Sequence, residues 1–134
     1  MKERPRMSLS VNEISNQVGL TILDSFPTGS NYICNPPVDN TDIDYMVLLP
    51  KDNKTLVQLN LYGKQWEHCG ENYGEDDKSN FMAFRKGKYN LILTDNPLYF
   101  QLFRDATTLA KKLNLLEKQQ RVALFKYVIE GEIE

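Results

Sequence analysis

Residues 42–49, Asp-Ile-Asp-Tyr-Met-Val-Leu-Leu, consist of an acidic start followed by an apolar run. A short apolar run of this kind is typical of a buried β-strand. Alternate residues of a strand project from the same face, so we expect Asp42 and Asp44 to lie side by side. Two carboxylates that close repel each other unless a cation lies between them. The pair therefore predicts a metal site, and hard carboxylate oxygens suit Mg²⁺ or Mn²⁺.

A glycine-serine pair, Gly29-Ser30, precedes this stretch, and eleven residues separate it from Asp42. Glycine lets a backbone approach a ligand closely, and backbone N–H groups together with a serine hydroxyl can hold a phosphate. Ser30 can equally serve as the cap of a short helix after a turn. In the first interpretation, the pair and the two aspartates form a site for a nucleoside triphosphate with its metal ion.

This combination resembles the signature of the DNA polymerase beta type nucleotidyltransferase superfamily, in which Gly-Ser precedes an Asp-x-Asp pair in an apolar context. The resemblance covers residues 9–49 and includes the helix expected before Gly29. Residues 81–92, 105–107 and 118–121 resemble small bacteriophage-encoded proteins placed in the same superfamily. The resemblance implies a nucleotidyltransferase-like fold and a Mg²⁺-dependent enzyme that moves NMP from an NTP to a hydroxyl acceptor.

The superfamily also implies roles for individual residues. Aspartates that match Asp42 and Asp44 bind two divalent ions, which hold the triphosphate and lower the pKa of the attacking hydroxyl. A third carboxylate on a later strand usually helps to bind one ion and accepts the proton. The matching strand here is residues 88–95, where Asn90 occupies the expected position. An amide coordinates a cation weakly and cannot accept a proton, and by strand parity Asp95 points to the other face. The catalytic residues expected are thus Asp42, Asp44 and Asn90, the last of which replaces the usual carboxylate.

Basic residues concentrate in the second half of the chain. Residues 85–126 carry nine Lys/Arg and three Asp/Glu, within a net charge of -2 for the whole sequence. Such a segment either faces a polyanion such as RNA or forms the solvated faces of two helices. Arg85 lies beside the strand that carries Asn90 and is the cation we expect to contact phosphate, with Gly29 and Ser30. Lys86 fits an exposed hairpin tip better.

The periodicity predicts an α+β fold, with a mixed sheet of three to five strands, an N-terminal helix and two C-terminal helices. We expect the helices at residues 9–23 (capped by Ser8 or Ser10), after Pro97 and after Leu116, and the strands at residues 42–49, 55–62, 81–85 and 89–94. The strand at 55–62 is expected to be half-buried and antiparallel to the one before it. Residues 26–30 predict a break and a turn, residues 35–37 a loop, and residues 66–79 irregular structure.

Length and composition fit an ordinary globular protein. The 134 residues suffice for a single domain, with residues 1–7 as a flexible tail. No apolar stretch approaches the roughly 20 residues of a membrane span, and Met1–Ser10 lacks the apolar segment of a signal peptide, so we expect a cytoplasmic protein without membrane contact. Two cysteines and one histidine exclude a disulfide scaffold and a multi-histidine metal centre.

Three functions remain open at this stage. The first is an enzyme that uses an NTP and transfers NMP to RNA, a host protein or a small molecule. The second is a nucleotidyltransferase fold that lost activity with the change to Asn90 and binds a nucleotide or a host macromolecule. The third is an RNA-binding protein that uses residues 85–126. Because the chain lacks room for a separate substrate-binding domain, a partner or a homodimer would supply acceptor specificity.

Overall fold

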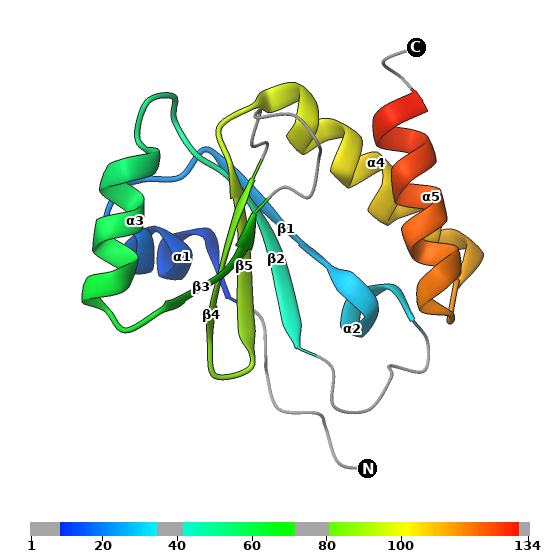
Figure 1. The fold of residues 1–134 in the computed structure, drawn as a ribbon, viewed down its shortest axis with the longest axis horizontal. Helices are drawn as coiled ribbons and strands as arrows, with labels where there is room; N and C mark the ends of the chain where they lie inside the picture. The colour runs from blue at the N-terminus through cyan, green and yellow to red at the C-terminus, as the bar shows by residue number, and fades with distance from the viewer. Residues whose placement is uncertain (1–8, 35–41, 72–80, 132–134) are drawn as a thin grey trace.

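The computed structural model describes residues 9–34, 42–71 and 81–131 (Figure 1). Within them, five strands form one mixed sheet in the order β1-β2-β5-β4-β3. The strands are β1 (Asp24–Thr28), β2 (Ile43–Leu48), β3 (Glu67–Glu71), β4 (Met82–Lys86) and β5 (Tyr89–Thr94). The helices are α1 (Val11–Val18), α2 (Gly29–Ile33), α3 (Lys54–Gly63), α4 (Pro97–Leu113) and α5 (Lys118–Gly131). This arrangement confirms the predicted α+β class, with its N-terminal helix and two C-terminal helices.

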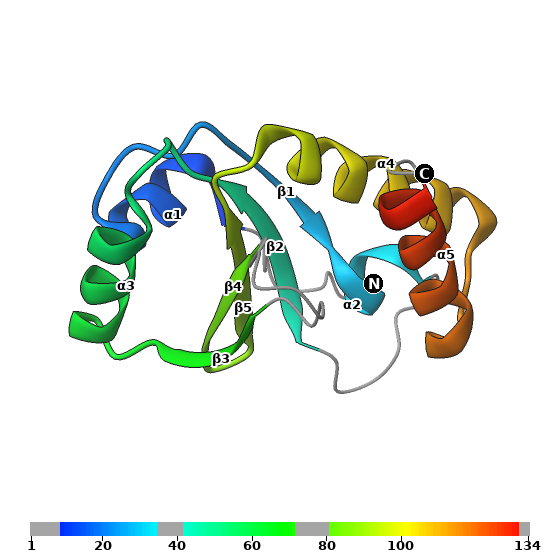
Figure 2. The same cartoon turned by 45° about the horizontal axis from the view of Figure 1, so that its top comes forward.

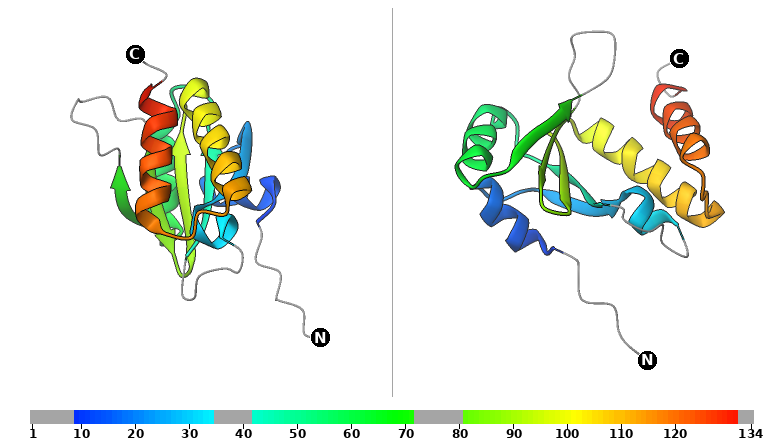
Figure 3. Two further views of the ribbon diagram at one scale, coloured as in Figure 1. Left: turned by 90° about the vertical axis from the view of Figure 1, so that its right-hand side faces the viewer. Right: turned by 60° about the horizontal axis from the view of Figure 1, so that its bottom comes forward.

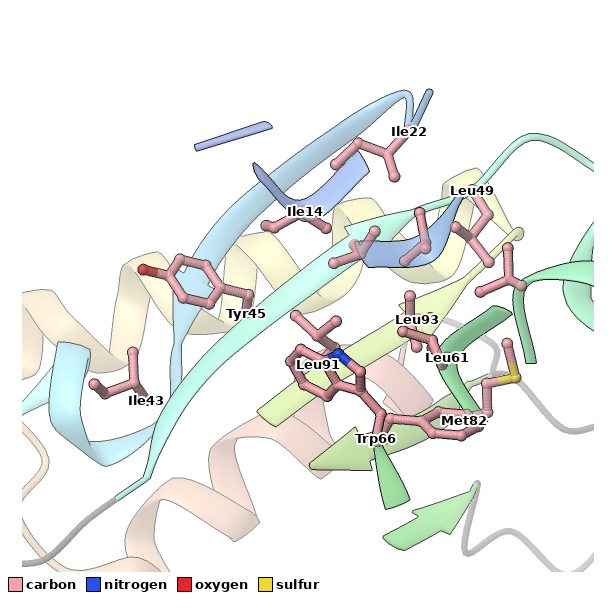
Figure 4. Packing of buried hydrophobic residues seen from close by; sticks show 14 residues of the cluster. Ile14, Ile22, Ile43, Tyr45, Leu49, Leu61, Trp66, Met82, Leu91 and Leu93 are labelled. Atoms are coloured by element: carbon pink, nitrogen blue, oxygen red, sulfur yellow. The ribbon is translucent and has the colours of Figure 1, made fainter. Parts of the chain in front are cut away.

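Helices cover both faces of the sheet. Helices α1 and α3 lie against one face, and α4 and α5 lie on the other side (Figure 1, Figure 2). The first face holds the larger apolar cluster, with members from α1, β2, α3, β4 and β5 that include Ile14, Tyr45, Leu61, Met82 and Leu91 (Figure 4). The second face holds Phe26, Met46, Tyr99 and Phe100. Since β2 is buried on both faces, its sequence is a nearly continuous apolar run.

Strand β2 lies between β1 and β5, and this pairing positions the candidate site. It pairs antiparallel with β1 and parallel with β5. Strands β4 and β5 form the predicted hairpin, whose turn contains Gly87 at φ 62°. Because β2 and β5 are parallel, their first residues meet at the same edge of the sheet, where the antiparallel β1 and β4 end.

The predicted strand at residues 55–62 is wrong, because these residues form α3. Apolar residues at 57, 59 and 61 alternate as in a strand, but Val57 and Leu61 are also one helical turn apart. In the structure these two side chains are fully buried against α1, while Leu59 is 63% exposed. The side chain of Asn60 also donates a 3.0 Å hydrogen bond to the Val18 carbonyl. Packing against α1 therefore selects the helix, and β2 takes β1 and β5 as neighbours instead.

Other boundaries differ because of single residues. The helix predicted over 9–23 ends at Val18, since Gly19 adopts φ 82° and caps it through a hydrogen bond to the Ser15 carbonyl. Ser10 is its N-cap and forms a capping box with Glu13, as predicted for this alternative. A break and a turn were predicted over residues 26–30, but residues 24–28 form β1 and α2 begins at Gly29. The strand can include Pro27 because β1 is an edge strand. Part of the segment predicted to be irregular is β3, paired with β4.

Two helices complete the second face. Helix α4 begins after Asn96, whose side chain accepts hydrogen bonds from the backbone of Leu98 and Tyr99. Helix α2 follows β1 directly and packs against α4 and β2 (Figure 3). In the described part of the chain, no helix is both long enough and apolar enough to cross a bilayer. The predicted tail at residues 1–7, the alternative cap Ser8, the loop at 35–37 and the irregular segment beyond residue 71 lie outside the described residues.

Candidate active site

Four polar residues form a row across the sheet where β2 and β5 begin. Asp44 of β2 is the register partner of Thr28 on one side and of Asn90 on the other. Asn90 in turn is paired with Arg85 of β4. Alternation along β2 places Asp44 on the face opposite to Tyr45, which belongs to the first apolar cluster. The register thus brings together residues that are far apart in sequence.

Asp44 is the carboxylate with the most perturbed surroundings in the row. Its Oδ1 atom is buried and has no hydrogen-bond partner among the residues that the structure describes. The pKa of Asp44 is raised from 3.8 to about 6, chiefly by burial. A hydrogen bond from Asn90 and the charge of Arg85 oppose this rise, and the charge of Asp42 adds to it. A buried acceptor without a partner carries an unfavourable desolvation cost. Asp44 is therefore suited to bind a cation.

Gly29 lies against Asp44 at the point where β1 passes into α2. It adopts φ 79°, which favours glycine, and a Cβ atom there would lie 2.0 Å from Asp44 Oδ2. The absence of a side chain thus lets the start of α2 approach the carboxylate. Ser30 follows in the first turn of α2 and is half-buried. The structure brings the predicted Gly-Ser pair and Asp44 together.

A buried hydrogen bond fixes the start of α2 relative to α4. Thr107 Oγ1 donates to the Phe103 carbonyl at 2.9 Å, so its remaining contact, 2.7 Å to Thr28 Oγ1, must be accepted from Thr28. Both threonines are about 2% exposed. Sequence analysis gave no signal for this contact, because the two residues lie on separate elements. The bond anchors the residue directly before Gly29.

Asp42 lies just before β2 and forms an ion pair with Arg85. The two side chains are 33% and 50% exposed, respectively, so solvent reaches both partners. The charges of Asp42 and Arg85 both act on Asp44, which shows that the three groups share one electrostatic environment. Arg85 was predicted as a phosphate contact, and in this structure it neutralises one of the two aspartates.

Asn90 has a second neighbour that sequence reasoning missed. The thiol of Cys69 donates to Asn90 Oδ1 at 3.4 Å, next to an irregularity in the β3–β4 pairing. Burial raises the pKa of this thiol above its usual value. The preceding residue, His68, packs its ring 5.1 Å from the Phe84 ring, which belongs to the opposite face. His68 and Cys69 thus point to different sides and do not form a metal pair.

The described residues of the site could supply two carboxylate ligands to a divalent cation, and no more. Among the described residues, no group of three or more His, Cys, Asp or Glu side chains is arranged to hold a metal. Two neighbouring carboxylates remain, one of which has an unpartnered buried oxygen. Magnesium needs only one or two carboxylates from a protein, because water and phosphate oxygens fill its other positions. Asp42 and Asp44 would hold such an ion together with a triphosphate.

The five-stranded mixed sheet, with its N-terminal helix and two C-terminal helices, is consistent with a nucleotidyltransferase-like fold. The solved structure of the conserved protein GrpB from Enterococcus faecalis is similar to this chain, with a TM-score of 0.51 and 17% identity. The match covers 92% of this chain and 90% of that chain. At that identity the likeness shows the fold alone. No family model and no curated protein matches the sequence.

Proposed function

We propose that this protein is a Mg²⁺-dependent nucleotidyltransferase that moves NMP from an NTP to a hydroxyl acceptor. The observation that carries the proposal is the buried, unpartnered Oδ1 of Asp44. The other carboxylate oxygen of this residue, Oδ2, faces Gly29, and the charge of Asp42 acts on the same carboxylate. A buried carboxylate oxygen of this kind is costly to leave unpaired. A cation shared with a triphosphate would supply the missing partner.

The residues of the candidate site have separate tasks in this proposal. Mg²⁺ would neutralise the triphosphate and make the acceptor hydroxyl easier to ionise. Asp42 and Asp44 would hold the ion, and Gly29 would let the first turn of α2 approach the phosphates with the hydroxyl of Ser30. Asn90 orients the Asp44 carboxylate through its hydrogen bond. The acceptor hydroxyl loses its proton to solvent water as its oxygen forms a bond to the α-phosphorus. The bond between the α-phosphorus and the oxygen that bridges to the β-phosphate breaks, and pyrophosphate leaves with its electron pair.

Asn90 favours a second candidate function, a binding module that retains the nucleotide site without transfer. It stands next to Asp44 in the parallel register, where a third carboxylate would complete the site. An amide adds no negative charge and accepts no proton. In that case the NTP, or a host macromolecule that carries a triphosphate, would be bound and not turned over.

Transfer of label from [α-³²P]NTPs to lysate components or RNA, with Mg²⁺ or Mn²⁺, separates the two candidates. The enzyme hypothesis predicts labelling by the wild-type protein and none by an Asp42→Asn, Asp44→Asn double variant. Lys86→Gln is the matched control, because the Lys86 ammonium donates to the Lys64 carbonyl at 2.9 Å and lies outside the row. An inert wild type with an active Asn90→Asp variant would favour the binding module. Labelling that survives the double variant contradicts both.

Several basic residues of the 85–126 segment already have partners within the protein. Arg104 pairs with Asp24 at 2.9 Å, and Lys111 donates to the Tyr32 carbonyl at 2.9 Å. Arg121 donates to the carbonyls of Leu115 and Leu116. These contacts support the solvated-face interpretation of the charge over a dedicated RNA surface. RNA therefore enters the proposal as one class of acceptor, beside a host protein or a small molecule.

A further inference from the structure

The ion pair between Arg85 and Asp42 has a consequence for metal binding. The guanidinium and a divalent cation are both positive, and both would use the Asp42 carboxylate. Like charges at one carboxylate repel each other, so the two ligands compete. The position next to Asp42 that a cation would take is held by a side chain of the protein itself.

We propose that Arg85 exchanges partners, so that it neutralises Asp42 in the free protein and moves to the phosphates when a metal–triphosphate complex binds. The inference rests on the proposed function and adds a mode of control to the same site. The exchange lowers the affinity of the site for a bare cation and raises its affinity for a cation that is bound to a nucleotide. Arg85 thereby selects the metal–nucleotide complex over the metal alone.

The exposure of the pair allows this exchange. Asp42 and Arg85 are 33% and 50% exposed, and solvent-exposed ion pairs contribute little to stability. Because a bare cation must displace Arg85 from Asp42, the pair should lower the affinity for that cation by about fivefold at most. A phosphate offers the guanidinium a stronger partner, because its oxygens match the planar fork of donors. The strand holds the backbone of Arg85 in place, so only the side chain has to move.

The position of Arg85 in the sheet places it near both aspartates of the candidate site. Its register partner is Asn90, which is itself the partner of Asp44. The charge of Arg85 already acts on Asp44 as well as on Asp42. The adjacent Lys86 points elsewhere, to the Lys64 carbonyl. Arg85 of the β4–β5 hairpin therefore interacts with Asp42 and Asp44, and the adjacent Lys86 provides a control of equal charge.

The test compares binding of Mn²⁺ alone with binding of Mn²⁺ and α,β-methylene-ATP, a nucleotide that cannot donate NMP. Free Mn²⁺ is measured by electron paramagnetic resonance at pH 7.5, and the nucleotide complex by calorimetry. Arg85→Gln should bind Mn²⁺ alone up to about fivefold more tightly and the Mn²⁺–nucleotide complex about tenfold more weakly. Lys86→Gln should change neither. A merely structural role for Arg85 would weaken both kinds of binding together.

Three outcomes decide between the proposals. Opposite changes in the two affinities support the exchange. Unchanged or weaker Mn²⁺ binding by Arg85→Gln, with Mn²⁺ binding lost in Asp44→Asn, overturns the exchange and leaves the proposed function in place. Mn²⁺ binding that Asp44→Asn does not reduce, or no Mn²⁺ binding by the wild type and Arg85→Gln, overturns the proposed site and the exchange with it.

Discussion

Replacing Asp44 with asparagine should stabilise the protein at neutral pH, although it removes a residue of the proposed site. Burial raises the pKa of Asp44 from 3.8 to about 6, so the folded state resists ionisation that the unfolded state accepts. A difference of this size corresponds to about 3 kcal/mol of unfolding free energy. Because Asp44 retains partial access to solvent and asparagine brings an amide that needs a partner, we expect a gain of about 1–3 kcal/mol.

The sign of this effect depends on pH in a defined way. Well below pH 3.8, Asp44 is protonated in both states and imposes no cost. As the pH rises from about 4 to about 6, the unfolded chain loses the proton first, and the wild type is destabilised relative to it. Above about pH 6 the cost is complete. The advantage of Asp44→Asn should therefore be small near pH 4 and full at pH 7.5.

Urea unfolding of both proteins at pH 4 and pH 7.5, in buffer with EDTA, measures the difference directly. Asp42→Asn is the matched control, because it removes a neighbouring carboxylate and an exposed ion pair, for which we expect a loss below about 1 kcal/mol. Adding Mg²⁺ with an NTP should then stabilise the wild type and not Asp44→Asn. An Asp44→Asn protein that is less stable than the wild type at pH 7.5, or whose advantage is the same at both pH values, would refute the reasoning.

Two further predictions concern the residues that place α2 beside Asp44. Gly29→Ala should destabilise the protein by more than the about 1–2 kcal/mol of a left-handed alanine, since its Cβ would also meet Asp44 Oδ2 at 2.0 Å. Combining it with Asp44→Ala should restore the part due to this contact, and strictly additive urea-unfolding energies would count against the contact. Thr28→Val should cost about 1 kcal/mol by removing the bond to Thr107, whereas Thr28→Ser should keep most of it. Equal thermal melting of both Thr28 variants would argue against that bond.

The grouping of the two aspartates in the candidate site could be predicted because it depends on local sequence. Alternation along one strand was enough to group Asp42 with Asp44, and an apolar run was enough to predict the strand that follows. The position of Asn90 beside Asp44 came from a family resemblance and corresponds to the parallel register. The fold class followed from the helical periodicities at both ends of the chain and the strands between them.

The remaining features depend on contacts between distant segments. Residues 54–63 carry a pattern that suits both a strand and a helix, and only the packing of Val57 and Leu61 against α1 decides between them. The contact of Cys69 with Asn90 requires the β3–β4 pairing, which no local signal announced. The ion pair of Arg85 with Asp42 likewise follows from strand order. Local patterns in a single sequence do not reveal which strands become neighbours in the sheet.

Calorimetric titration of the wild type and of Asp44→Asn with each NTP, with and without Mg²⁺, tests the account most directly. We predict that the wild type binds at least one NTP and that binding weakens strongly when Mg²⁺ is removed. We also predict that Asp44→Asn, shown to be folded by its urea unfolding curve, loses the Mg²⁺-dependent part. Nucleotide binding that is equally strong without Mg²⁺, or unchanged in Asp44→Asn, would contradict the assignment of Asp42 and Asp44 as part of a metal–triphosphate site.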